Sequence, residues 1–140
     1  MMKTIAILIM ALLPCVGFAR IGESREECDK RYGKVTVEPL VHEGITYLSY
    51  KLHGFSVSLN LIDSKCGRIR YAKTDYGKLE EAEIVALLAG NGKDWKKISN
   101  TQWKDSAGSM AKVTGKYLVV ETLSYRQHKE GNKIPGGNSN

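Results

Sequence analysis

Two tryptophans and several lysines share one short part of this 140-residue chain, which includes Lys93-Asp94-Trp95-Lys96-Lys97 and Trp103-Lys104. Indole rings can stack on sugar rings or bases, and ammonium groups can meet phosphates or carboxylates. This part of the chain is therefore a candidate surface for an anionic ligand, made of Trp95, Lys96, Lys97, Trp103 and Lys104. The alternative is that both rings are buried against a sheet, since Trp contributes heavily to small cores, while the lysines keep the surface hydrated.

Other residues that could do chemistry form no catalytic pattern. Gly54-Phe55-Ser56-Val57-Ser58 resembles the G-x-S-x-G turn of a catalytic serine, but it ends in Ser and precedes a strand rather than a helix. His42, His53 and His128 lie far apart and lack metal-ligand spacing. Glu121 interrupts an apolar strand face, where a bulge, an edge position or a buried functional carboxylate would explain it. We therefore predict a protein that is not an enzyme, with no catalytic residue, metal site or cofactor.

The element around which the fold is organised is a predicted β-hairpin in residues 54–73. Apolar residues alternate with polar ones along its first arm, at Phe55, Val57, Leu59 and Leu61. This period of two is typical of a strand in an antiparallel sheet with one covered face. Turn residues follow at 63–67, and residues 68–73 predict the returning strand.

Helices and further strands are predicted on either side of this hairpin. Ser24 and Glu27 form a capping box for a helix over residues 25–32, and residues 80–88 predict a second, more buried helix. The other strands are predicted at residues 45–53, 97–104, 109–113 and 117–125. The predicted fold is therefore α+β, an antiparallel β-meander sheet with two helices packed on one face, in the order α-βββ-α-βββ. The similarity of the two halves has two explanations. It reflects either a repeat, or the fact that both helices follow the same amphipathic pattern.

The start of the chain predicts export. Lys3, an apolar run over residues 5–13 and the small residues of Gly17-Phe18-Ala19 are typical of a signal peptide cleaved after residue 19. The alternatives are a lipid-modified Cys15 and an uncleaved membrane anchor. The predicted organisation is a signal peptide at 1–19, one α+β domain at 20–126 and a disordered tail at 127–140. We expect a periplasmic or secreted protein without a transmembrane anchor after cleavage.

Cleavage would leave two cysteines, Cys28 and Cys66. An even pair in an exported chain predicts a disulfide bond, although two unrelated thiols remain the alternative.

Positive charge is concentrated in the last third of the chain. Residues 20–92 hold 11 basic and 11 acidic residues, whereas residues 93–140 hold 9 basic and 4 acidic residues. This asymmetry indicates either an anionic partner or a solvated basic surface. Export argues against nucleic acid as that partner.

A family resemblance adds to this interpretation. Gly22-Glu23-Ser24, Glu27-Cys28 and Tyr32-Gly33, followed by the alternating hairpin, resemble the small exported domains of the SmpA/BamE and β-lactamase-inhibitor-protein type. The segment also resembles small exported bacterial proteins of unknown function. The resemblance implies a helix followed by a β-meander. The predicted function is a non-catalytic protein-binding or envelope-assembly module, or alternatively a binder of anionic envelope glycan through residues 93–104.

Overall fold

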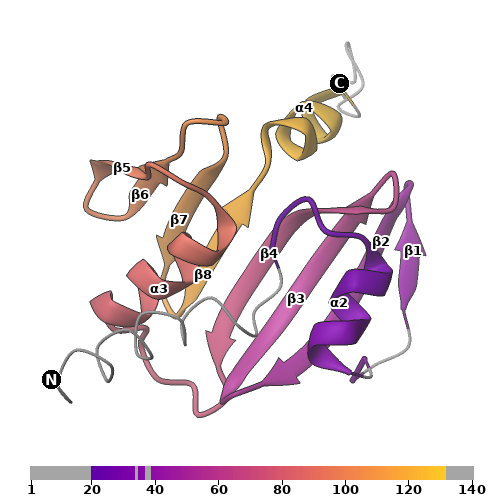
Figure 1. Cartoon of the computed structure of the whole chain (residues 1–140), viewed down its shortest axis with the longest axis horizontal. Helices are drawn as coiled ribbons and strands as arrows, with labels where there is room; N and C mark the ends of the chain where they lie inside the picture. The colour runs from indigo at the N-terminus through magenta and orange to yellow at the C-terminus, as the bar shows by residue number, and fades with distance from the viewer. Residues whose placement is uncertain (1–19, 34, 37–38, 132–140) are drawn as a thin grey trace, which may run out of the picture.

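The computed structural model describes residues 20–33, 35–36 and 39–131 (Figure 1). The predicted signal peptide lies outside the described residues. The elements are α2 (Arg25–Tyr32), β1 (Leu40–His42), β2 (Ile45–Leu52), β3 (Phe55–Ile62), β4 (Lys65–Lys73), α3 (Glu81–Asn91), β5 (Lys96–Ser99), β6 (Gln102–Lys104), β7 (Met110–Thr114), β8 (Tyr117–Glu121) and α4 (Leu123–Gly131). No helix in the described part of the chain is long and apolar enough to cross a membrane.

The strands form one eight-stranded antiparallel sheet in the order β1-β2-β3-β4-β8-β7-β6-β5. Each half of the chain contributes one helix followed by four strands, and the last strands of the two halves, β4 and β8, pair in the middle (Figure 1). Both helices also begin with a capping box, completed by Glu27 in α2 and Glu83 in α3. The α+β class and the antiparallel sheet are thus as predicted, and the two halves share one order of elements.

The predicted element order was wrong in detail. Each half has four strands rather than three, because residues 40–42 form the additional strand β1 and residues 97–104 are not one strand. The turn at Asn100 and Thr101 divides that segment into β5 and β6. The central hairpin was predicted correctly, although β4 begins earlier than expected and includes Cys66, which the prediction had placed in the turn.

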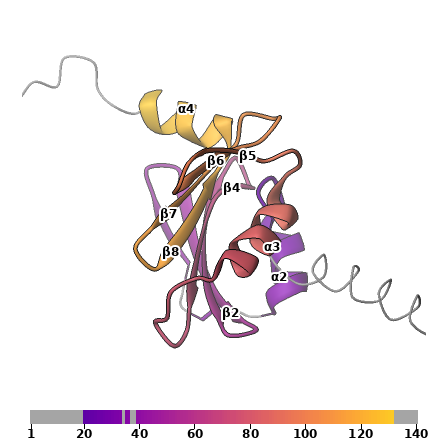
Figure 2. The same ribbon diagram turned by 90° about the vertical axis from the view of Figure 1, so that its left-hand side faces the viewer.

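The core lies between one face of the sheet and the helices α2 and α3, which Figure 2 shows on the same side of the sheet. Alternate side chains of the strands point to this face, which we call the helix face. The buried cluster there includes Leu48, Tyr50, Val57, Leu59, Ile69, Tyr71, Leu118 and Val120 from the sheet, Cys28 from α2, and Leu87 and Leu88 from α3. The alternation in β3 read from the sequence therefore does distinguish the covered face from the other.

The C-terminal part of the domain differs most from the prediction. The expected strand at 117–125 stops at Glu121, and α4 begins at Leu123. Thr122 Oγ1 accepts a hydrogen bond from the Tyr125 backbone N–H at 3.0 Å, which caps the first turn of this helix. Tyr125 is buried and its hydroxyl accepts a hydrogen bond from Asn60 Nδ2 at 2.8 Å. Residues 127–131, expected to be disordered, therefore belong to a helix, and residues 132–140 lie outside the described part.

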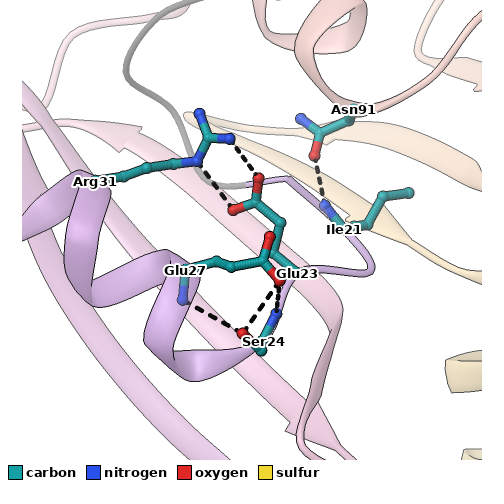
Figure 3. A network of polar contacts seen from close by, with 6 residues as sticks. All are labelled: Ile21, Glu23, Ser24, Glu27, Arg31 and Asn91. Atoms are coloured by element: carbon teal, nitrogen blue, oxygen red, sulfur yellow. Dashed lines mark hydrogen bonds and ion pairs between the residues drawn. The ribbon is translucent and has the colours of Figure 1, made fainter.

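A polar network fixes the segment before α2 (Figure 3). The buried Glu23 accepts from Arg31, with one oxygen 2.7 Å from Nη2 and the other 3.1 Å from Nε. The backbone of Gly22 and Glu23 exchanges hydrogen bonds of 2.7 Å with Cys66. The Ile21 N–H donates to Asn91 Oδ1 at 3.1 Å. The start of the domain is therefore tied to α2, to β4 and to the end of α3.

Candidate binding face

The face of the sheet opposite α2 and α3 carries the candidate site. We call it the open face, because α4 covers only one end of it (Figure 2). Cross-strand pairing arranges its side chains in two continuous rows. The first row consists of Ser49, Ser58, Arg70, Val119, Lys112 and Gln102. The second row consists of Tyr47, Asn60, Arg68, Glu121, Met110, Lys104 and Lys96.

These rows are rich in positive charge. Their basic residues are Arg68, Arg70, Lys96, Lys104 and Lys112, and Lys51 continues the face on β2. Glu121 is the one carboxylate in the two rows, and it lies 3.6 Å from Arg68 Nε. The remaining five cations form no ion pair with a described residue. Because one sheet face holds them together, they produce a positive potential that attracts anions.

A cleft of about 270 Å³ opens on this face near the ends of β3 and β4. Its residues are Lys51, Ser56, Ser58, Arg70, Ala72, Lys73, Thr74, Tyr76, Lys116 and Tyr117. The Arg70 guanidinium lies over the Tyr117 ring, 4.7 Å from its centroid. Lys73 differs from the other cations because its Nζ lies 2.9 Å from Glu83 on α3. This hydrogen bond raises the pKa of Lys73 above its usual value.

A second hollow of about 310 Å³ lies beside the cleft, further along the same rows. It is lined by residues of β4, β6, β7, β8 and α4, among them Arg68, Lys112, Val119, Glu121 and Arg126. Val119 pairs with Arg70 of the cleft. The two hollows therefore form one basic surface across the middle of the sheet, which suits an extended anionic ligand better than a small one.

The structure divides the predicted Trp and Lys surface between the two faces of the sheet. Trp103 pairs with the buried Ala111 and lies on the helix face, where Lys97 Nζ is 5.8 Å from its ring centroid. Lys104 and its partner Lys96 lie on the open face. The predicted set is therefore not one continuous surface, because residues next to each other in a strand point to opposite sides.

Both tryptophan rings are partly buried against the core. They line one groove of about 310 Å³ together with Val85, Leu88 and Ala89 of α3, and with Gly92 and Asp94. Trp95 Nε1 donates to the Leu88 carbonyl oxygen at 2.7 Å, which fixes that ring. The rings thus contribute to packing and also line a surface groove, so neither of the two sequence-based alternatives describes them fully.

The residues considered for catalysis are not brought together. Ser56 and Ser58 lie in the basic cleft, whereas Glu121 lines the second hollow. His53 is exposed at the turn between β2 and β3 and lines neither of these spaces. Among the residues that the structure describes, no group of three or more His, Cys, Asp or Glu side chains could hold a metal ion.

Cys28 and Cys66 are both buried thiols in the core cluster under α2. The backbone of Cys66 pairs with Gly22 and Glu23, and the Cys28 N–H donates to Ser24 one helical turn away. The two cysteines are thus attached to the same small part of the fold. Burial is the largest cause that raises the pKa of each thiol, to about 12 for Cys28.

Sequence reasoning found the Trp and Lys segment but missed the open face. The alternation of Arg68 and Arg70 with the buried Ile69 marks two basic residues on one face of β4. Arg68 and Arg70 share a face with Lys112 only because β4 pairs with β8. The residue pattern of neither strand predicts this pairing. Comparison of the chain with family models, with curated proteins and with solved structures gives no match.

Proposed function

We propose that this protein is a non-catalytic binding module whose open face binds an acidic surface of another protein. The observation that carries the proposal is the charge of that face: Lys51, Arg68, Arg70, Lys96, Lys104 and Lys112 lie on it with the single carboxylate Glu121. Complementary charge favours encounter with an acidic partner and disfavours basic ones.

The chemistry of the face favours binding over catalysis. Cations, hydroxyl groups and aromatic rings hold and orient an anion, and Tyr and Arg are enriched among the residues that dominate interface energetics. General acid–base catalysis needs a positioned titratable group with a suitable pKa. The carboxylate in the two rows is instead placed beside Arg68. The predicted signal peptide supports a partner in the cell envelope or outside the cell, and it argues against nucleic acid as the natural ligand.

Binding by a charge-reversed variant tests the proposal. The purified chain would be immobilised at low salt and exposed to envelope extract, and each captured protein would be purified and its Kd measured. The double variant Arg70→Glu with Lys112→Glu changes two exposed residues of the open face. We expect it to weaken binding by at least about tenfold, and salt to weaken binding of the unmodified chain.

The matched control reverses two exposed lysines away from the open face, Lys30 on α2 and Lys78 before α3. The control has the same net charge as the test variant. We expect its Kd to stay within about twofold of the unmodified value. Equal weakening by both double variants would mean that net charge, rather than the open face, drives binding, and no weakening by either would refute the proposal.

The alternative function is the binding of an anionic envelope glycan in the groove between α3 and β6. The observation in its favour is that Trp95 and Trp103 line this one groove and that Lys97 lies over the Trp103 ring. Polygalacturonate is a suitable probe. Binding that is lost in Lys97→Glu and kept in the open-face variant would favour this alternative, and the reverse result would favour the protein partner.

A further inference from the structure

The basic cleft exists because small side chains lie between large ones. Ser56, Ser58 and Ala72 form its floor on β3 and β4, while Lys51 on β2 and Tyr117 on β8 stand at its sides. Ser56 pairs with both Lys51 and Ala72, so the floor and one wall form a single cross-strand row. The β4–β8 ladder ends at Tyr71 and Leu118, next to this floor. The result is a depression in an otherwise continuous sheet surface.

Most of the positive charge in this depression is not neutralised by a carboxylate of the described residues. Lys51, Arg70 and Lys116 line it without an ion pair, whereas the charge of Lys73 is taken up by Glu83. No hydrogen bond joins the Ser56 or Ser58 hydroxyl to a described residue, so both are available as donors.

Two aromatic residues border the same cleft. Tyr117 is 42% exposed and carries the Arg70 guanidinium on its ring. Tyr76 is 77% exposed and has a positive φ of 62°, which a non-glycine residue adopts rarely. Stacking holds the plane of a guanidinium against a ring and leaves its N–H groups directed outward, where they can form two parallel hydrogen bonds to a carboxylate.

We infer that this cleft is the anchor pocket of the open face and that it receives the carboxylate of one Asp or Glu side chain of the partner. The inference rests on the proposed function. Arg70 binds the carboxylate, Lys51 and Lys116 add charge on either side, and Ser58 donates from the floor. Tyr76 and Tyr117 shield these contacts from water, as the surroundings of an interface hot spot do.

A capped hexaglutamate peptide is the probe that tests the anchor pocket. The ¹⁵N-labelled full chain would be titrated with this peptide, and Kd would be obtained from the amide shifts. We expect the largest shifts at Ser58, Arg70 and Tyr117. We expect Arg70→Gln to weaken binding by about fivefold to tenfold, and the matched variant Lys112→Gln to weaken it by less than about twofold.

The outcomes of this titration distinguish the anchor-pocket inference from the proposed function of the open face. Equal weakening by Arg70→Gln and Lys112→Gln, with shifts spread evenly over the face, would overturn the pocket and leave the proposed function standing. An absence of shifts anywhere on the open face would count against both. A parallel titration with inorganic phosphate tests the ligand class, because tighter binding of phosphate than of hexaglutamate at the same amides would overturn the assignment to a carboxylate.

Discussion

Asn91, a single buried amide, connects three parts of the chain. Its Nδ2 donates to the Tyr71 hydroxyl and to the Leu87 carbonyl, both at 2.8 Å, and its Oδ1 accepts from the Ile21 N–H. Tyr71 is fully buried. The amide therefore joins α3 to the centre of the sheet and to the segment before α2.

Removal of this amide is predicted to destabilise the domain strongly. Asn91→Ala removes the hydrogen bonds that the amide makes with the Tyr71 hydroxyl and with the Ile21 N–H, and we expect it to lower the free energy of unfolding by about 2–4 kcal/mol. Urea unfolding measures this change. The control Asn100→Ala changes an exposed turn residue and should cost less than about 0.5 kcal/mol. Equal losses for the two variants would show that the amide network contributes nothing specific.

The disulfide between Cys28 and Cys66 stays a prediction. The burial of both thiols indicates at which stage of folding the bond should form. The buried thiols have raised pKa values, so few thiolates form once the domain has folded, and the bond should form before the core closes. We expect exported protein, unfolded without reductant, to contain no titratable thiol. Cys66→Ala should then lower stability by about 2–5 kcal/mol. Two free thiols in that assay would refute the bond.

The same thiols make the pH dependence of stability sensitive to the redox state. In reduced protein the unfolded thiols lose their protons near pH 9, whereas folded Cys28 keeps its proton to about pH 12. The unfolded state therefore binds fewer protons in this range, and stability falls as the pH rises from about 9 to 12. The oxidised protein has no thiol to titrate and should lose stability less steeply. Burial also raises the pKa values of Tyr50 and Tyr71. Both tyrosines are present in the reduced and in the oxidised protein, so their contribution cancels when the two pH profiles are compared.

At the scale of elements, α4 depends on a glycine in β4. A Cβ added at Gly67 would lie 2.8 Å from Cδ2 and 2.9 Å from Cβ of Tyr125. Gly67→Ala should therefore displace α4, weaken the hydrogen bond between Asn60 and Tyr125, and cost about 1–3 kcal/mol. Thermal or urea unfolding measures the cost.

Two further variants make this prediction specific. Gly90 lies in α3, and a Cβ added there would meet nothing within 4 Å. Gly90→Ala should accordingly stabilise the domain by about 0.5–1 kcal/mol. In a Tyr125→Gly background, which removes both Cβ and Cδ2 of that residue, the cost of Gly67→Ala should nearly vanish. A cost that stays the same in that background would mean that contact with α4 is not its cause.

The elements also show what the sequence could and could not predict. The alternation in β3 predicts a strand with one covered face, and the capping box of Ser24 predicts the start of α2. The alternation of Val119 with Leu123 and Tyr125 looks like one continuous strand, however. What turns Tyr125 into a helical residue is the Thr122 cap and a contact with Asn60, 65 residues away. Such long-range contacts override a local pattern.

The same limit applies to the candidate site. The residue types around Trp103 indicate a binding surface, but strand pairing decides which neighbours share a face with this ring. Lys97 lies on the same face as Trp103, whereas Lys104 lies on the opposite face. The open face is assembled from both halves of the chain through the pairing of Arg70 with Val119. Its charge could be counted from the sequence, but its position required the topology of the whole sheet.

For the molecule as a whole, the charge on the open face affects both binding and stability. Lys96 and Lys104 are directly opposite each other in β5 and β6. Like charges in this arrangement repel and destabilise a sheet. A surface that was shaped by stability alone would place opposite charges there, so the arrangement is consistent with a face that binds at some cost in stability.

This trade-off gives a prediction with two readouts of opposite sign. Lys104→Glu replaces the repulsion across the strands with an attraction, and we expect the free energy of unfolding to rise by about 0.2–1 kcal/mol. The same change should weaken binding of hexaglutamate, because it places a negative charge on the open face. In the control Lys30→Glu, an exposed residue in the last turn of α2 becomes acidic. Stability should then fall slightly because of the helix dipole, and binding should not change. A fall in stability with Lys104→Glu would refute the repulsion between Lys96 and Lys104, and unchanged binding would show that Lys104 does not contribute to the binding surface.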